Sequence, residues 1–299
     1  MFFGLLLALA VSGEGAGFQN GEVHRVAVAQ AETLHVTVYG RGDDVVIVPG
    51  IWSMTYAFRK VVPLLTARGF RVTVIEPLGV ASSSGPRHAD YSLGAQGARV
   101  GAALDSLGIR RAIFAGQALG TSMLLHMEVE TPGRIAGLVS IEGGAGKSVA
   151  TPGLKRGLSI AAIVFRVFPS RALLRRRLRG TMENVSAEKS WITPEVVAAY
   201  AAPWTGRISA TLETYREMAK SGEKRHLTAH LGSIRVPVDL LLGAAPHYGG
   251  PDTEGTEALA RLSRTRITRI PKAGHLLHEE RPDAVADAIV RMRTETLRR

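Results

Sequence analysis

The chain has 299 residues, of which 45% are hydrophobic, and it contains no cysteine. A chain of this size and composition can bury a large core, either as one large α/β domain or as two small ones. The missing cysteines exclude disulfides, thiolate catalysis and cysteine-based metal sites. The formal net charge is +11, but no nucleic-acid-binding motif accompanies it, so nucleic acid is not an expected partner.

The chain begins with an apolar run, M-F-F-G-L-L-L-A-L-A-V, which is too short to span a bilayer as a helix. Residues 1–20 resemble the apolar core of a signal peptide with cleavage near Ala8–Ala10, although no basic residues precede the run. This pattern favours export from the cytoplasm. The alternative is a segment that simply packs on the domain.

Strand-like and helix-like segments alternate from residue 21 to residue 144. Two segments with alternating apolar residues predict a hairpin that turns at Ala29–Ala31. Beyond it, β-branched runs predict strands buried on both faces, with helices between them. The expected strands are 23–30, 32–40, 43–50, 70–77, 111–116 and 135–141, and the expected helices are 56–68, 91–107 and 119–131. Such alternation is typical of a parallel sheet wound by right-handed crossovers.

The alternation stops between residues 145 and 230, where the sequence is helical in character and rich in arginine and proline. It resumes in 231–299, with strands expected at 236–243 and 265–270 and helices at 253–262 and 283–298. We therefore predict an α/β core of residues 21–144 and 231–299, interrupted by a helical insertion at 145–230.

Five arginines lie between Arg171 and Arg179 in this insertion. Leucines at helical spacing among them predict an amphipathic helix with a solvated basic face. A face that contacts an anionic membrane surface is the alternative.

The segment Gly116–Gly120, G-Q-A-L-G, has the spacing of a nucleophile elbow, G-x-S-x-G, between a predicted strand and a predicted helix. In that motif a serine occupies the sharp turn, but here the central residue is Ala118. Its methyl group cannot attack a substrate. Ser122 lies one helical turn further along and is expected to point away from the turn.

Four motifs in this order resemble those of the α/β-hydrolase superfamily with a helical cap. They are V-P-G-I-W at Val48–Trp52, E-P-L-G-V-A-S-S-S-G-P at Glu76–Pro86, G-Q-A-L-G, and A-G-H-L-L-H-E-E-R-P at Ala273–Pro282. The segment Ile192–Trp204 resembles caps of the haloalkane dehalogenase and epoxide hydrolase branches. The resemblance implies a mostly parallel central sheet flanked by helices, with residues 145–230 as the cap.

The resemblance also implies a set of site residues. His275 takes the place of the catalytic histidine, and backbone N–H groups of Ile51 and Leu119 take the place of the oxyanion hole. The acid that orients the histidine is either Glu142, which follows a buried strand, or Asp252, which lies in the loop where most members carry it. An exposed Glu142 without a role is the alternative reading.

The remaining histidines lie outside these motifs. His278 is expected on a helix surface, and no motif surrounds the others, which are expected to be structural or exposed: His24, His35, His88, His126, His226, His230 and His247. No cofactor and no metal site are expected.

These residues predict a serine hydrolase scaffold of carboxylesterase type, inactive as written because Ala118 replaces the nucleophile. The expected partner is a small apolar, ester-like molecule. Two alternatives stay open. One is a natural non-catalytic relative that binds such a ligand, and the other is a protein whose basic cap binds a membrane or an anionic partner.

Overall fold

One mixed β-sheet lies at the centre of the molecule. The computed structural model describes residues 20–146, 164, 165, 167, 170–224, 226–251 and 253–297. Within these residues eight strands form one sheet in the order β1-β2-β4-β3-β5-β6-β7-β8. The strands are β1 (Glu22–Ala29), β2 (Glu32–Tyr39), β3 (Asp43–Val48), β4 (Phe70–Glu76), β5 (Ala112–Gln117), β6 (Ile135–Ile141), β7 (Val238–Gly243) and β8 (Thr265–Ile270). The expected strands are therefore all present.

The sheet is antiparallel at one edge and parallel elsewhere. β1 pairs with β2 as the predicted hairpin, and β2 pairs antiparallel with β4. All other neighbours are parallel, from β4 through β3 to β8. Every residue of β5 and β6 is buried, as central strands covered on both faces require. This arrangement confirms the predicted mostly parallel sheet flanked by helices.

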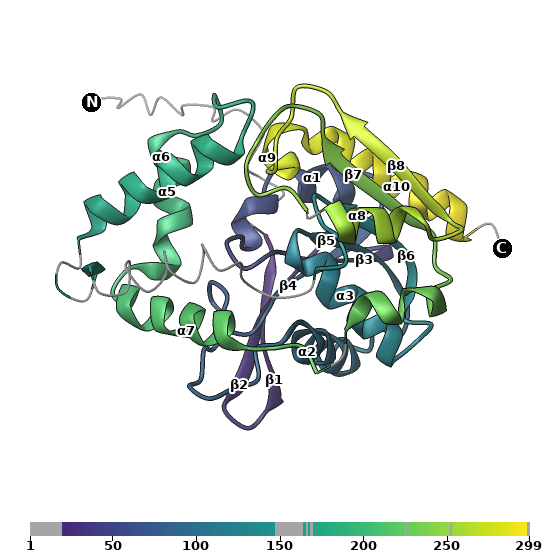
Figure 1. Cartoon of the computed structure of the whole chain (residues 1–299), viewed down its shortest axis with the longest axis horizontal. Helices are drawn as coiled ribbons and strands as arrows, with labels where there is room; N and C mark the ends of the chain where they lie inside the picture. The colour runs from purple at the N-terminus through teal and green to yellow at the C-terminus, as the bar shows by residue number, and fades with distance from the viewer. Residues whose placement is uncertain are drawn as a thin grey trace, which may run out of the picture.

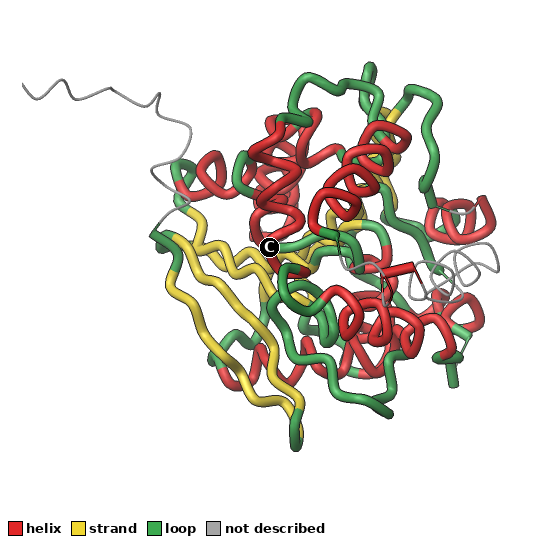
Figure 2. The backbone as a smooth tube through the Cα atoms, turned by 90° about the vertical axis from the view of Figure 1, so that its left-hand side faces the viewer, coloured by secondary structure: helices red, strands yellow, loops and turns green. Residues whose placement is uncertain are grey.

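Helices cover both faces of the sheet (Figure 1, Figure 2). α2 packs against α3, and α3 packs against the central strands, while α1 packs against α10. The core helices are α1 (Val61–Thr66), α2 (Leu93–Ser106), α3 (Leu119–Glu130), α8 (Thr253–Ala260), α9 (Leu277–Glu280) and α10 (Pro282–Leu297). Short 3-10 turns are η1 (Thr55–Phe58), η2 (Ala202–Trp204), η3 (Leu227–Ala229) and η4 (Leu231–Ser233).

The expected helix at 56–68 is two elements, η1 and α1, separated at Arg59 and Lys60. In a continuous α-helix the N–H of residue 63 would bond the carbonyl of Arg59. Pro63 has no N–H, so this bond cannot form. The interruption follows from that one residue.

The inserted segment between β6 and β7 is helical where it is described, and its helices α5 (Arg171–Val185), α6 (Pro194–Ala201) and α7 (Ile208–Lys220) group on one side of the molecule in Figure 1. α5 buries Leu174 and Met182 and exposes Arg175, Arg176 and Arg177. The arginines therefore lie on a solvated face, as the amphipathic pattern predicts. Contact of that face with a membrane stays a prediction.

Among the described residues no helix is long and apolar enough to cross a membrane. The apolar run at residues 1–19 lies outside them. Its assignment as a signal peptide stays a prediction.

Candidate functional site

The turn between β5 and α3 has the backbone of a nucleophile elbow, with Ala118 at its tip. Ala118 has φ 48° and ψ −119°, a left-handed backbone region that costs a residue bearing a Cβ about 1–3 kcal/mol. Its N–H donates to the Ile141 carbonyl at 2.9 Å, and its carbonyl accepts from the Thr121 N–H at 3.0 Å. Position 118 is thus held in a strained conformation while its side chain is a methyl group.

Two glycines allow this turn to pack against its neighbours. A Cβ on Gly120 would lie 2.1 Å from the Val48 carbonyl oxygen, and a Cβ on Gly116 would lie 2.6 Å from backbone atoms of Thr121. Real Cβ atoms do not approach backbone this closely, so both positions require glycine. The glycine spacing therefore follows from packing against β3 and α3, independently of any nucleophile.

The loop after β3 lies beside the elbow, because a Cβ on Gly50 would lie 3.3 Å from the Ala118 Cβ. Gln117 Oε1 accepts the Gly50 N–H at 2.9 Å, and the Tyr215 hydroxyl donates to the Ile51 carbonyl at 2.5 Å. Burial raises the pKa of Tyr215, so its hydroxyl stays a donor. The cap helix α7 thereby fixes the loop that carries one expected oxyanion donor.

The second expected oxyanion donor is Leu119, the first residue of α3. Its N–H is one of the first four in the helix, which have no acceptor within the helix. The Leu119 N–H is therefore available to a ligand bound at the elbow. Its role, like that of the Ile51 N–H, stays a prediction.

Glu142 directly follows β6 and is 1% exposed, so it is not the exposed glutamate of the alternative reading. Its backbone has φ 50°, and its N–H donates to the Leu241 carbonyl at 2.9 Å. The Gly243 N–H donates to Oε1 of the side chain. A buried carboxylate is costly unless it is paired, so the partners of Oε2 decide what Glu142 can do.

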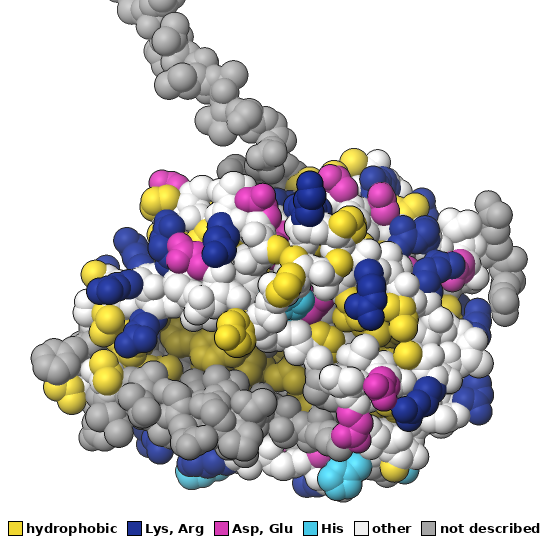
Figure 3. Space-filling model, turned by 45° about the horizontal axis from the view of Figure 1, so that its top comes forward, with side chains coloured by type: hydrophobic (Ala, Val, Ile, Leu, Met, Phe, Trp, Pro, Cys, Tyr) yellow, Lys and Arg dark blue, Asp and Glu magenta, His cyan; other side chains and the backbone are white. Residues whose placement is uncertain are grey.

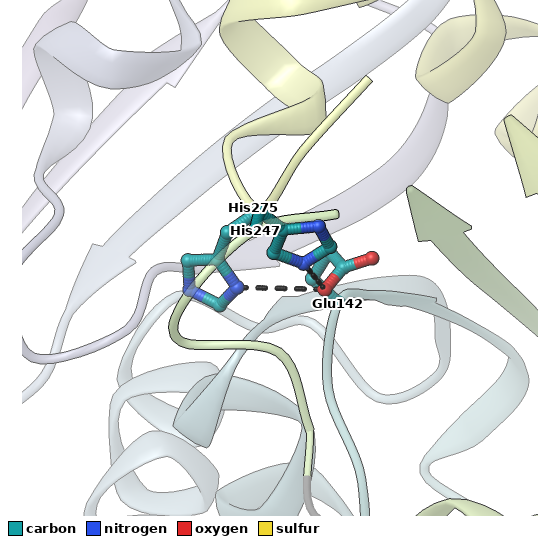
Figure 4. Close-up of side chains that lie close together, drawn as sticks. All are labelled: Glu142, His247 and His275. Atoms are coloured by element: carbon teal, nitrogen blue, oxygen red, sulfur yellow. Dashed lines mark hydrogen bonds and ion pairs between the residues drawn. The ribbon is translucent and has the colours of Figure 1, made fainter. Parts of the chain in front are cut away.

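One of these partners is His275, whose Nδ1 lies 3.5 Å from Glu142 Oε2 (Figure 4). The structure therefore brings together the histidine that follows β8 and the acid that follows β6. Because Nδ1 faces the carboxylate, Nε2 lies on the opposite side of the ring. This is the arrangement in which a carboxylate orients a histidine base.

The backbone around His275 is held by the cap. The His275 N–H donates to the Val185 carbonyl at 2.8 Å, at the end of α5. The buried carboxylate of Glu280 accepts the Gly274 N–H at 3.1 Å and also the N–H groups of Ala187 at 2.9 Å and Glu188 at 2.8 Å. Glu280, in the segment Ala273–Pro282, thus positions the histidine loop against the cap.

The second partner of Glu142 is His247, which the sequence did not single out. His247 Nε2 lies 3.0 Å from Glu142 Oε2, and its Nδ1 lies 2.7 Å from the Ala245 carbonyl oxygen (Figure 4). One signal could have found it, because His247 lies in the loop after β7, where most members carry the acid. The ligand atoms of Glu142, His247 and His275 all lie within 4.8 Å of one another, so these residues could hold a metal ion.

His278 is fully buried, so its expected place on a helix surface is wrong. Its ring stacks on Phe58 with 4.8 Å between centroids. Burial, together with the smaller effects of the nearby His275, Arg59 and Lys60, lowers the pKa of His278 to about 3. The short helix α9 turns this side chain into the core, where it stays neutral.

Two other residues were considered from the sequence, Asp252 and Ser122. Asp252, the alternative acid, lies outside the described residues. Ser122 is buried, and its Oγ donates to the Gly144 carbonyl at 2.7 Å and accepts the Gly146 N–H at 3.0 Å. Its hydroxyl is therefore committed to the backbone after β6.

An aromatic cluster adjoins the loop after β3. Trp52 is 42% exposed. Its ring stacks on Trp204 with 5.8 Å between centroids and meets Tyr215 edge-on at 4.8 Å. Figure 3 shows a hollow with a hydrophobic floor on this face of the molecule. An exposed tryptophan beside the elbow loop is suited to contact an apolar ligand.

Comparison with known proteins identifies the fold. A model described as the alpha/beta hydrolase family matches residues 45–288, which is more than half of the chain. The chain therefore belongs to the α/β hydrolase family, as the sequence motifs predict. A haloalkane dehalogenase from Bradyrhizobium elkani has a similar structure, with a TM-score of 0.70 and 22% identity over 92% of this chain and 100% of that one.

Two curated relatives that cover most of this chain are named as hydrolases. A 2-hydroxy-6-oxononadienedioate/2-hydroxy-6-oxononatrienedioate hydrolase of a Pseudomonas species is 26% identical over 84% of this chain and 88% of that protein. A 2-hydroxy-6-oxo-6-phenylhexa-2,4-dienoate hydrolase of Burkholderia cepacia is 25% identical over 84% of this chain and 87% of that protein. Similarity to both extends over most of each chain.

Proposed function

We propose that this chain is an acyl-hydrolase scaffold that binds a small apolar carbonyl compound, and that Ala118 prevents covalent turnover. A serine hydrolase needs a nucleophile, a histidine base, an acid and an oxyanion hole. In this proposal His275 is the base position, Glu142 is the acid, and the N–H groups of Ile51 and Leu119 face the ligand carbonyl. Only the nucleophile is missing.

The strained backbone at Ala118 carries the proposal. An alanine with no catalytic role gains nothing from φ 48°, and the cost of about 1–3 kcal/mol must be met by the surrounding packing. The strain coincides with a buried Glu142 that faces His275 across 3.5 Å. Together they support a site from which only the serine Oγ has been removed.

Two observations support the ligand class. The curated relatives are named for 2-hydroxy-6-oxo acids, which carry a carbonyl group that an oxyanion hole can polarise. The exposed face of Trp52 and its aromatic neighbours supply an apolar surface next to Ile51. We therefore expect the ligand to be an ester or ketone with an apolar portion that contacts Trp52.

The test restores the missing group with Ala118→Ser. We expect this variant to be labelled by a fluorophosphonate probe and to hydrolyse short p-nitrophenyl esters at least about 10³-fold faster than the parent chain. The parent should show neither labelling nor hydrolysis above background, because no other hydroxyl occupies the elbow tip.

Ser122→Ala, combined with Ala118→Ser, is the matched control and should keep the label. This locates the reaction at position 118. Absence of labelling in a folded Ala118→Ser protein would overturn the intact-site proposal and favour a non-catalytic ligand-binding protein.

A further inference from the structure

One carboxylate oxygen in the site is faced by two imidazoles. Glu142 Oε2 lies 3.0 Å from His247 Nε2 and 3.5 Å from His275 Nδ1. The orientation of His275 by Glu142 accounts for one of these approaches. It leaves the second histidine without a function.

The hydrogen bonds of His247 determine which ring nitrogen carries the proton. Nδ1 lies 2.7 Å from the Ala245 carbonyl oxygen, and a carbonyl can only accept, so the N–H of a neutral ring is at Nδ1. Nε2 then directs its lone pair at Glu142 Oε2. Two lone pairs at 3.0 Å repel one another unless a proton, as in a doubly protonated imidazolium, or a metal ion lies between them. A backbone carbonyl that fixes a histidine tautomer in this way is a usual outer partner of a metal ligand.

The other two donor atoms, Glu142 Oε2 and His275 Nδ1, are also available to a ligand. Glu142 Oε1 accepts the Gly243 N–H, which leaves Oε2 for a ligand. The Nδ1 atom of His275 is buried and has no hydrogen-bond partner among the described residues. In the tautomer of His275 that carries its proton on Nε2, which is not the tautomer that acts as a base, each of the three residues directs a lone pair to one place.

The loop after β7 leaves room at this place. A Cβ on Gly250 would lie 3.3 Å from His247 Nε2 and 3.5 Å from Glu142 Oε2. Gly249 has φ 85°, a conformation in which a side chain is strained. Any side chain at Gly250 would occupy the space beside His247 Nε2 and Glu142 Oε2.

We propose that Glu142, His247 and His275 bind a divalent transition metal of the Zn²⁺ type. Two imidazoles and one carboxylate are a ligand set that such ions favour. A tetrahedral Zn²⁺ with bonds of about 2.0–2.2 Å separates its ligand atoms by about 3.4 Å. The distances of 3.0 and 3.5 Å to Glu142 Oε2 lie on either side of this value, and all three ligand atoms lie within 4.8 Å of one another.

Metal binding would change what His275 can do. A metal on Nδ1 places the ring proton on Nε2, so this nitrogen donates a hydrogen bond and cannot accept a proton. The metal-bound form is therefore excluded from general-base chemistry. The site goes beyond the proposed function, and its existence does not depend on it.

The test uses the unmodified chain, with Ala118 in place, and isothermal titration with Zn²⁺ alone. We expect a single-site isotherm, weakened at least about 10- to 100-fold by His247→Ala and by Glu142→Gln. Co²⁺ should give visible absorption bands typical of low coordination, and both variants should lose them. His24→Ala, a histidine on β1, is the matched control and should bind as the parent does.

Circular dichroism and the Tm of each variant establish that it is folded before the titration. Absence of Zn²⁺ binding by the parent, or binding that neither His247→Ala nor Glu142→Gln weakens, would overturn the metal site. This readout is independent of fluorophosphonate labelling, so a failure of the proposed function would leave it unaffected.

Discussion

The two sides of the site differ in what they retain. The elbow, Gly116–Gly120, keeps the backbone of a reactive turn but carries no reactive side chain. The Glu142 cluster, Glu142 with His247 and His275, keeps its reactive side chains and contains one more histidine than a catalytic triad needs. The elbow therefore lacks a reactive side chain, whereas the Glu142 cluster has three.

Packing explains this difference. The elbow is shaped by contacts of Gly116 and Gly120 with neighbouring backbone, and loss of a serine Oγ leaves those contacts unchanged. A buried carboxylate, by contrast, is stabilised only by partners for its charge, because an unpaired buried charge is costly. Loss of either histidine would therefore be expected to destabilise Glu142. The elbow backbone therefore records the shape of the site without showing that it is active, and activity depends on the side chains of the Glu142 cluster and of position 118.

The largest expected effect tests whether the Glu142 cluster acts on the elbow. In the Ala118→Ser background, Glu142→Gln should slow ester hydrolysis by about 10⁴-fold, because an amide cannot stabilise the His275 imidazolium in the required orientation. Steady-state rates with p-nitrophenyl acetate measure this change. KM should change far less than kcat, since Glu142 lies behind the histidine.

Asp252→Asn in the same background is the control. It should leave the rate within a few-fold of the Ala118→Ser protein. If the two results are exchanged, Asp252 is the acid and the Glu142 cluster has a separate role.

A second prediction concerns the stability of the histidine segment. The pKa of His278 is about 3 in the folded chain and about 6.5 when unfolded. Between these values the unfolded state binds more protons, so the folded state is destabilised as the pH falls below 6.5. The slope is about 1.4 kcal/mol per pH unit, and the loss over the whole window is on the order of 5 kcal/mol.

Chemical denaturation at pH 7, 5 and 4 measures this loss. His278→Leu removes the titrating group and should make the stability less dependent on pH than that of the parent, while His24→Leu should not. Equal pH dependence in all three proteins would show that His278 does not stay neutral in the folded state.

The fold could be predicted because strand and helix periods alternate clearly from residue 21 to 144 and again after 231. Glu142 and His275 could be predicted as neighbours because both follow parallel strands, whose carboxyl ends meet at one edge of the sheet. Their assignment relied on family motifs as well as on the residues themselves.

His247 and His278 could not be predicted in the same way. The pairing of His247 with Glu142 depends on how the loop after β7 folds back, and P-H-Y-G-G has no periodicity that reports this. His278 is in a helix of one turn, α9, which is too short for an amphipathic pattern to indicate its buried face. The burial of each is decided by tertiary contacts.

The smallest expected effect tests whether packing alone maintains the elbow. Gly120→Ala places a methyl group 2.1 Å from the Val48 carbonyl oxygen, so it should lower the free energy of unfolding by about 3 kcal/mol. Gly180→Ala is the matched control, because nothing lies within 4 Å of a Cβ there and the residue is inside helix α5. That change should raise stability by about 0.5–1 kcal/mol. Midpoints of urea denaturation measure both. A Gly120→Ala protein as stable as the parent would mean that the elbow backbone can relax, and the strain at Ala118 would then lose its value as a trace of the missing nucleophile.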